Sequence, residues 1–294
     1  MSALGAPAAA SSWRGAVIFL HGSGDSGPGL KQWVGHVRPD FLSALERARI
    51  KVVFPSAPAR PYSMMGGAAV AVWFDRWALG PDAAEDPAGL ASTTAVLRAA
   101  VAALQREGVP PGRIVLGGFS MGGGTALYCG LAAPLAEAEA PAPGSGEGEE
   151  GAGSGADEGE SKGKGSGVGV ELGGVFSLSS WVTSASALWP ALEAASPAPP
   201  PKGGGCDSGR LPPVFMAHGE KDGMIDPRWG AATAARLAAC SGHRGGSGGG
   251  DGGGGGAVSP RLDVSWEVEP GVGHEPGPGM LEALEAWILS RALP

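Results

Sequence analysis

A serine between glycines gives the clearest chemical signal in this sequence. Ser120 lies in Gly118-Phe119-Ser120-Met121-Gly122, directly after the apolar run Ile114 to Leu116. In this G-x-S-x-G pattern a strand turns so sharply into a helix that the backbone needs residues without a Cβ. The turn would expose the Ser120 hydroxyl as a nucleophile and direct the amide N–H of Met121 toward a developing oxyanion. A chain with 54 glycines can also form the pattern as a plain glycine-rich loop, so its context must decide.

A serine nucleophile needs a base, and later loops offer both a histidine and an acid. Asp222 follows the apolar run Val214 to Ala217, and His274 follows an alternating strand pattern that ends near Glu269. The order serine, acid, histidine is that of the α/β-hydrolase triad. His274 would remove the serine proton and Asp222 would orient the imidazole. Asp226 is the alternative acid, ranked second because it lies farther from the strand end.

Another glycine-rich loop follows the strand expected at 16–20. It reads His21-Gly22-Ser23-Gly24, and the amide N–H of Ser23 is the candidate for a second oxyanion donor. His21 itself is expected to be a hydrogen-bonded structural imidazole and not the base.

The remaining histidines show no metal-binding pattern. His36, His218 and His243 each lack a second ligand at metal spacing, although His218 is placed to shape the loop of Asp222. No phosphate-binding or dinucleotide-binding glycine motif stands in its required context. The sequence therefore predicts neither a metal nor a cofactor.

The elements expected around these loops alternate between strands and helices, which predicts a mostly parallel central sheet flanked by helices. Alternating polar and apolar residues place the last strand near a sheet edge. Strands are expected at 16–20, 50–54, 114–116, 169–178, 214–217 and 262–269. Helices are expected at 33–47, with a kink or restart at Pro39, at 88–106, from the elbow at Met121 on through 126–138, and at 228–239 and 280–293.

The prolines at 55–61 exclude a strand interior or a helix there, and the whole segment from Pro55 to Asp75 is predicted to be a long ordered loop over the sheet. Its large apolar side chains either form a wall of an acyl pocket or only pack the loop onto the protein. The candidates for substrate binding are Met64, Met65, Trp73 and Phe74, together with Trp181 after a later strand.

Composition favours one large domain. The chain has 294 residues, 43% of them hydrophobic, but Gly and Pro concentrate in low-complexity tracts at 140–167, 195–209 and 242–256. These tracts have too few large apolar residues to offset the entropy cost of ordering, and we expect them to be insertions in a single domain with an ordered core at about 13–293. The first twelve residues are expected to form a loose arm.

The formal net charge of −8 argues against a general affinity for nucleic acid or anionic membranes. Three cysteines without metal spacing favour a reducing compartment. With no continuous apolar run of about 20 residues and no signal peptide, we expect a cytoplasmic protein without a stable membrane anchor. A very short organelle-targeting segment and the oligomeric state are left open.

Five blocks of the sequence resemble the acyl-protein thioesterase and small carboxylesterase family, also called lysophospholipases. The blocks are 17–27, 55–58 with 60–61, 73–75, 118–123 and 178–181. The resemblance implies an α/β-hydrolase without a large cap domain, acting on thioesters of S-acylated proteins, lysophospholipids and simple esters. By position it assigns Ser120, Asp222 and His274 to the triad and the amides of Ser23 and Met121 to the oxyanion site. The sequence departs from the family in its insertions, at 220–223, where the family often has Asp-x-Asp-Pro, and at Met121, where glutamine is usual.

Two other functions remain open at this stage. One is a general short-chain carboxylesterase without a protein substrate, and the other is a protein that binds ligands on a hydrolase fold without turnover. For both the acyl-protein thioesterase and the short-chain carboxylesterase, hydrolysis should increase with pH as His274 loses its proton. Only a neutral imidazole can accept the serine proton.

Overall fold

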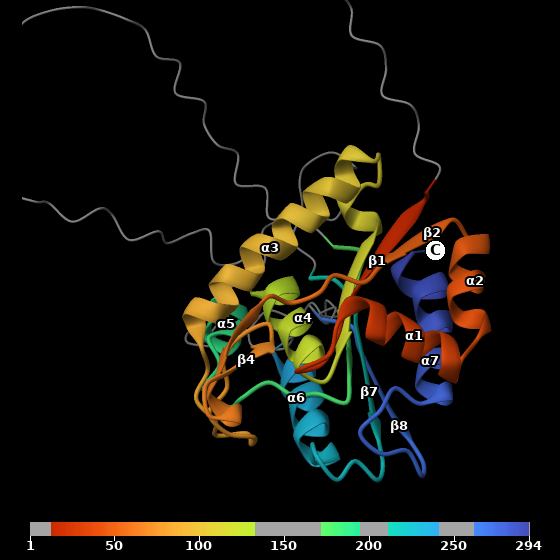
Figure 1. The fold of residues 1–294 in the computed structure, drawn as a ribbon. Helices are drawn as coiled ribbons and strands as arrows, with labels where there is room; N and C mark the ends of the chain where they lie inside the picture. The colour runs from red at the N-terminus through yellow and green to blue at the C-terminus, as the bar shows by residue number, and fades with distance from the viewer. Residues whose placement is uncertain (1–12, 133–171, 195–210, 241–261, 294) are drawn as a thin grey trace, which may run out of the picture.

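The computed structural model describes residues 13–132, 172–194, 211–240 and 262–293 (Figure 1). At its centre is a sheet of six strands in the order β2-β1-β5-β6-β7-β8, and every neighbouring pair is parallel. The strand order reverses between β1 and β5, which is where open α/β sheets place their ligand sites. The strands are β1 (Gly15–Leu20), β2 (Ile50–Val53), β5 (Ile114–Phe119), β6 (Gly174–Leu178), β7 (Val214–Gly219) and β8 (Val264–Glu269).

Helices cover both faces of the sheet, and each face has its own apolar core (Figure 1). Alternate residues of β1 enter the two cores, because side chains of a strand point to opposite faces: Ile18 packs with α3 and α4, and Phe19 with α1, α2 and α7. The helices are α1 (Gly27–Val37), α2 (Asp40–Arg47), α3 (Pro87–Arg106), α4 (Met121–Leu131), α5 (Leu188–Ala194), α6 (Pro227–Ala239) and α7 (Pro278–Trp287). This is the mostly parallel α/β architecture predicted from the sequence.

Pro39 divides the first helical region as expected. α1 ends at Val37, and α2 begins at Asp40 with Pro39 as its N-terminal cap residue. The predicted helix began six residues too late, because Ser26 caps α1 by accepting a hydrogen bond from the amide of Gly29. The short helix α5 was missed, since seven residues are too few to show a helical period.

The proline-rich loop contains a hairpin that the sequence analysis excluded. β3 (Ala59–Tyr62) pairs antiparallel with β4 (Ala68–Ala71), and a 3₁₀ turn at Ser63–Met65 joins them. The prediction that prolines exclude a strand here was wrong. Each strand of a two-stranded ribbon has one unpaired edge, and a proline such as Pro61 is tolerated there because no neighbouring strand needs its N–H.

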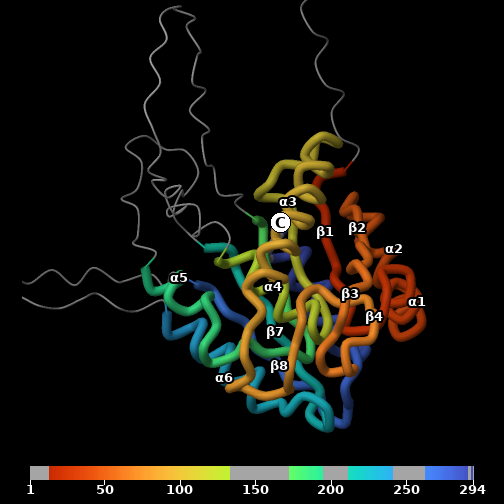
Figure 2. Tube along the Cα trace, turned by 60° about the vertical axis from the view of Figure 1, so that its left-hand side comes forward, coloured from red at the N-terminus to blue at the C-terminus, as the bar shows by residue number. Residues whose placement is uncertain are grey.

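α3 is the one helix in the described ranges that could cross a membrane by length and mean hydropathy. It contains no continuous apolar run of about 20 residues, because Ser92, Thr93, Thr94 and Arg98 interrupt its alanines, leucines and valines. Its predicted stripe is buried in the core, and α3 lies beside α4 in both views (Figures 1 and 2). The stripe consists of Leu90, Thr94, Leu97, Val101 and Leu104.

Several expectations fall outside the described residues. They are the loose arm at 1–12, the insertions at 140–167, 195–209 and 242–256, the helix beyond 132, and His243.

Candidate active site

The predicted elbow forms between β5 and α4. Ser120 has φ +54° and ψ −123°, a strained conformation for a residue with a side chain. The flanking glycines are required by close backbone approaches: a Cβ on Gly118 would lie 2.3 Å from the carbonyl carbon of Gly122, and one on Gly122 would lie 2.4 Å from the carbonyl oxygen of Leu20. The chain can make this turn only because neither position carries a side chain.

The structure brings together the three side chains predicted to form a triad. His274 Nε2 lies 2.9 Å from Ser120 Oγ, and His274 Nδ1 lies 2.8 Å from Asp222 Oδ2. The carboxylate can only accept, so Nδ1 carries the proton and Nε2 is free to accept a hydrogen bond from the serine hydroxyl. These three residues follow the C-terminal ends of β5, β7 and β8, which meet at one edge of the parallel sheet.

Asp222 is held by four hydrogen bonds. Its Oδ1 accepts from the amides of Met224 and Ile225 at 2.9 and 2.8 Å, and its Oδ2 accepts from His218 Nε2 at 3.1 Å and from His274. Burial alone would raise the pKa of this carboxyl, but the hydrogen bonds from the two histidines and Ile225 bring the pKa well below its usual value. The acid is therefore ionised and fixed in position beside His274.

His218 shapes the acid loop, as its position in the sequence suggested. Its Nε2 lies 3.1 Å from both Asp222 Oδ2 and the carbonyl oxygen of Ile225, and because both are acceptors, Nε2 must be the protonated nitrogen. The other nitrogen, Nδ1, is buried without a hydrogen-bond partner. The imidazole is thus fixed against the acid through Nε2.

Asp226, the alternative acid, lies elsewhere. Its carboxylate caps the N-terminus of α6 and pairs with the side chain of Arg228. Of the two acids, only Asp222 contacts His274.

The two amides proposed to bind an oxyanion belong to adjacent loops. β1 and β5 pair in register from Ala16 to Leu20, so the loop of Ser23 lies beside the first turn of α4, and Ser23 Oγ lies 3.6 Å from Met121 Sδ. Within the described residues, neither the Ser23 nor the Met121 amide N–H has a hydrogen-bond acceptor. Both donors are available to a ligand, and the N-terminal end of α4 adds a partial positive charge.

His21 has the structural role expected of it. Its Nε2 accepts from the amide of Ala57 at 2.9 Å, and its Nδ1 donates to the carbonyl oxygen of Gly22 at 2.7 Å. The side chain is fully buried, and burial lowers the pKa of the imidazole, so it stays neutral. Its contacts hold the Ser23 loop against the segment after β2.

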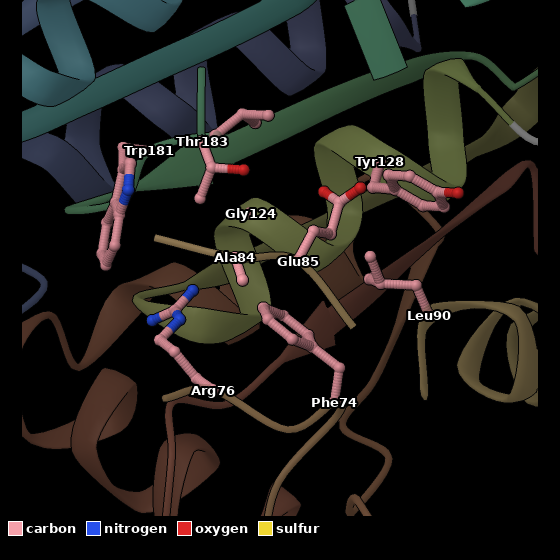
Figure 3. A pocket seen from close by; sticks show the side chains of 10 residues that line it. Phe74, Arg76, Ala84, Glu85, Leu90, Gly124, Tyr128, Trp181 and Thr183 are labelled. Carbon is pink, nitrogen blue, oxygen red and sulfur yellow. The ribbon is translucent and has the colours of Figure 1, made fainter. Parts of the chain in front are cut away.

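The five candidates for substrate binding lie in different places. Phe74 and Trp181 line an open pocket (Figure 3). Trp73 does not line this pocket; it is buried in the core, where its Nε1 donates to the carbonyl oxygen of His21 at 2.8 Å. Met64 and Met65 are exposed on the 3₁₀ turn and do not line this pocket.

The pocket also contains the polar residues Arg76, Glu85, Tyr128 and Thr183, which the sequence analysis did not select. Their side chains are charged or carry a hydroxyl group, and nothing further in the sequence indicated that they line a pocket. The full lining consists of Phe74, Arg76, Ala84, Glu85, Leu90, Gly124, Tyr128, Trp181, Val182 and Thr183.

In the described part of the chain, no three His, Cys, Asp or Glu side chains gather as a metal site.

The sheet, the elbow and the histidine–acid pair define the chain as an α/β-hydrolase. A profile of the phospholipase/carboxylesterase family matches residues 7–140. The lysophospholipase-like protein 1 of Mus musculus is 28% identical over 276 residues, covering 94% of this chain and 86% of the relative. The acyl-protein thioesterase 1 of Gibberella zeae is 28% identical over 291 residues, covering 97% and 94%.

Solved structures agree on the fold. The crystal structure of Zea mays acyl-protein thioesterase 2 superposes with a TM-score of 0.64 at 22% identity, covering 95% of this chain and 94% of that one. The chain is similar to the phospholipase/carboxylesterase family over residues 7–140, and it is a hydrolase.

Proposed function

We propose that the protein is a serine hydrolase that cleaves acyl esters and thioesters through an acyl-enzyme on Ser120. The observation that carries this proposal is the continuous hydrogen-bonded chain from Ser120 Oγ through His274 to Asp222. It supplies a nucleophile, a base with an accepting nitrogen, and an ionised acid that fixes the base.

In the first half of the reaction, Ser120 Oγ attacks the acyl carbon while its proton passes to His274 Nε2. Asp222 stabilises the resulting imidazolium, and the amides of Ser23 and Met121 donate to the oxyanion. As the tetrahedral intermediate collapses, the bond to the alcohol or thiol breaks and His274 returns the proton to that leaving group. The acyl group is then bound to Ser120.

In the second half, water replaces the leaving group. His274 takes a proton from the water as its oxygen attacks the acyl carbon, and the same two amides hold the second oxyanion. Collapse breaks the bond to Ser120, whose Oγ recovers a proton from His274, and a carboxylic acid leaves. His274 accepts and returns each proton that is transferred in this cycle.

The names of the relatives supply the candidate substrates. Acyl-protein thioesterase and lysophospholipase-like relatives support S-acylated proteins and lysophospholipids for this chain. A specific observation favours the second candidate, a short-chain carboxylesterase: a long acyl chain in the pocket would have to pack against the buried guanidinium of Arg76. We keep a cytoplasmic location and action without a cofactor as part of the proposal.

A panel of acyl substrates tests the proposal. The purified protein should hydrolyse p-nitrophenyl esters, and Ser120→Ala and His274→Ala should each reduce kcat at least about a thousandfold. Comparing acetyl to palmitoyl esters with an S-palmitoylated peptide separates the two candidates, because a steep preference for short chains contradicts the thioesterase assignment. Saturable binding of esters without turnover by wild type would contradict both.

A further inference from the structure

Arg76 is a buried cation in the wall of the pocket. It follows the block Trp73 to Asp75, and only 5% of its surface is exposed. The guanidinium carbon lies 5.0 Å from the ring centre of Phe74 and 4.4 Å from that of Trp181, so the charge sits against two aromatic faces. Figure 3 shows Phe74 and Trp181 on either side of its guanidinium.

The side chain of Arg76 has no ion-pair or hydrogen-bond partner among the described residues. Asp75 is the adjacent acid, but its carboxylate accepts from the amide and hydroxyl of Ser63 and from the backbone of Arg76. Glu85 lines the same pocket and accepts from the amide of Ala187. Burial lowers the pKa of Arg76 to about 10, which leaves it charged near neutral pH. A buried charge normally has a partner, and the guanidinium of Arg76 can donate to an acceptor that a ligand brings into the pocket.

A second polar group in the lining is also unsatisfied. Thr183 Oγ1 is buried and has no hydrogen-bond partner within the described ranges. A hydroxyl can donate to an anion, and a guanidinium can donate two parallel hydrogen bonds to a carboxylate. Arg76 and Thr183 both line the pocket, so it offers two candidate donors to a carboxylate.

The pocket lies close to the nucleophile. Its floor includes Gly124, one helical turn beyond Ser120 on α4, which corresponds to a rise of about 6 Å. Trp181 follows β6, whose last residue, Leu178, accepts a hydrogen bond from the amide of Ser120 at 2.9 Å. A ligand group in the pocket and an acyl carbon at Ser120 could therefore belong to one small substrate.

We propose that the pocket beside Arg76 and Thr183 is a subsite for a carboxylate carried by the substrate. This deepens the proposed function and rests on it, since Ser120 must act on the same molecule. The carboxylate of Glu85 in the same lining disfavours a doubly charged phosphate more than a singly charged carboxylate, because like charges repel. Esters with a free carboxylate on the acyl chain are thus preferred over neutral esters.

Binding can be tested without catalysis. Ser120→Ala protein is titrated with glutarate, with dimethyl glutarate as the neutral control and with inorganic phosphate, and its melting temperature is recorded. Glutarate should raise the melting temperature and dimethyl glutarate should not. Adding Arg76→Gln or Thr183→Val to Ser120→Ala should abolish or weaken the glutarate shift. Equal shifts with and without Arg76, stabilisation by phosphate alone, or no shift with glutarate would each overturn the inference.

Kinetics test the same subsite on a substrate. The probes are the mono-4-nitrophenyl ester of glutaric acid and its methyl-capped neutral analogue. Wild type should favour the charged ester by about tenfold or more in kcat/KM, as expected for a hydrogen bond to a charged group. The ratio should fall toward one in Arg76→Gln and rise in Glu85→Gln, which removes the opposing charge. Equal ratios in wild type and Arg76→Gln contradict the subsite, whereas no hydrolysis of either ester contradicts the proposed function.

Discussion

Replacing Gly122 by alanine tests whether the elbow needs the close packing that the structure shows. A Cβ at this position would lie 2.4 Å from the carbonyl oxygen of Leu20 and 2.7 Å from that of His21. Ordinary contacts to a Cβ begin near 3.4 Å, so α4 must move away from the end of β1 by about 1 Å. We expect this overpacking to cost about 1–3 kcal/mol of unfolding free energy.

Gly35→Ala is the matched control. Gly35 lies in α1, and no atom lies within 4 Å of the position of its added Cβ. The same substitution there should stabilise the protein by about 0.5–1 kcal/mol, because alanine loses less backbone entropy than glycine in a helix. Both changes affect the unfolded chain similarly, so the difference between them isolates the clash.

The same displacement should affect the reaction. Leu20 and His21 lead into the loop of Ser23, so moving α4 away from them separates the amides of Ser23 and Met121. A misplacement of about 1 Å at reacting groups costs about a hundredfold in rate. Gly122→Ala should therefore lower kcat by about that factor, with KM changed much less. Urea unfolding and ester hydrolysis provide the two measurements. Stability and kcat equal to those of Gly35→Ala would refute the reasoning.

Further changes test the acid and its supports. Asp222→Asn should reduce kcat by about a thousandfold or more, because the amide cannot stabilise the imidazolium. The control is Asp226→Asn at the cap of α6, which should leave kcat within about twofold. Equal losses in the two variants would contradict the assignment of the acid. His218→Phe should lower kcat and shift its pH profile by removing one donor to Asp222, and an unchanged profile would show that His218 only fills space. Folding lowers the pKa of Asp222 below its unfolded value of about 3.9. Between these two pKa values the unfolded chain binds more protons than the folded protein. The stabilisation by Asp222 is therefore complete above about pH 4 and is lost as the pH falls through this window. Urea unfolding from pH 2.5 to 6 should show this loss in wild type and a flatter dependence in Asp222→Asn; identical slopes would contradict the shifted pKa.

Most of the sheet could be predicted because its signals are local. The strands that became β1, β5 and β7 are continuous apolar runs, and their burial on both faces required that composition. The elbow was predictable because the glycines on both sides of Ser120 directly follow an apolar run, which is the context of a sharp strand–helix turn. Chain order then pointed to Asp222 and His274, and the structure places His274 within hydrogen-bonding distance of both Asp222 and Ser120.

Features that depend on tertiary packing could not be predicted. The hairpin forms because β3 pairs with β4, and this pairing overrides the local preference of Arg60-Pro61. The burial of Arg76 could not be predicted from the sequence. One of the two aromatic rings that cover its guanidinium belongs to Trp181, which is distant in sequence and is brought there only by folding. Choosing Asp222 over Asp226 by distance from the strand end agreed with the geometry, but only the folded loop shows Asp226 capping a helix.

Trapping the covalent intermediate tests the central claim most directly. The protein is mixed with a slow ester, quenched in acid and digested, and the peptide that contains Ser120 is weighed. The account predicts that this peptide gains the mass of the acyl group in wild type, and that no peptide gains it in Ser120→Ala. An acyl group found on another residue, or hydrolysis that continues at the wild-type rate in Ser120→Ala, would contradict the account.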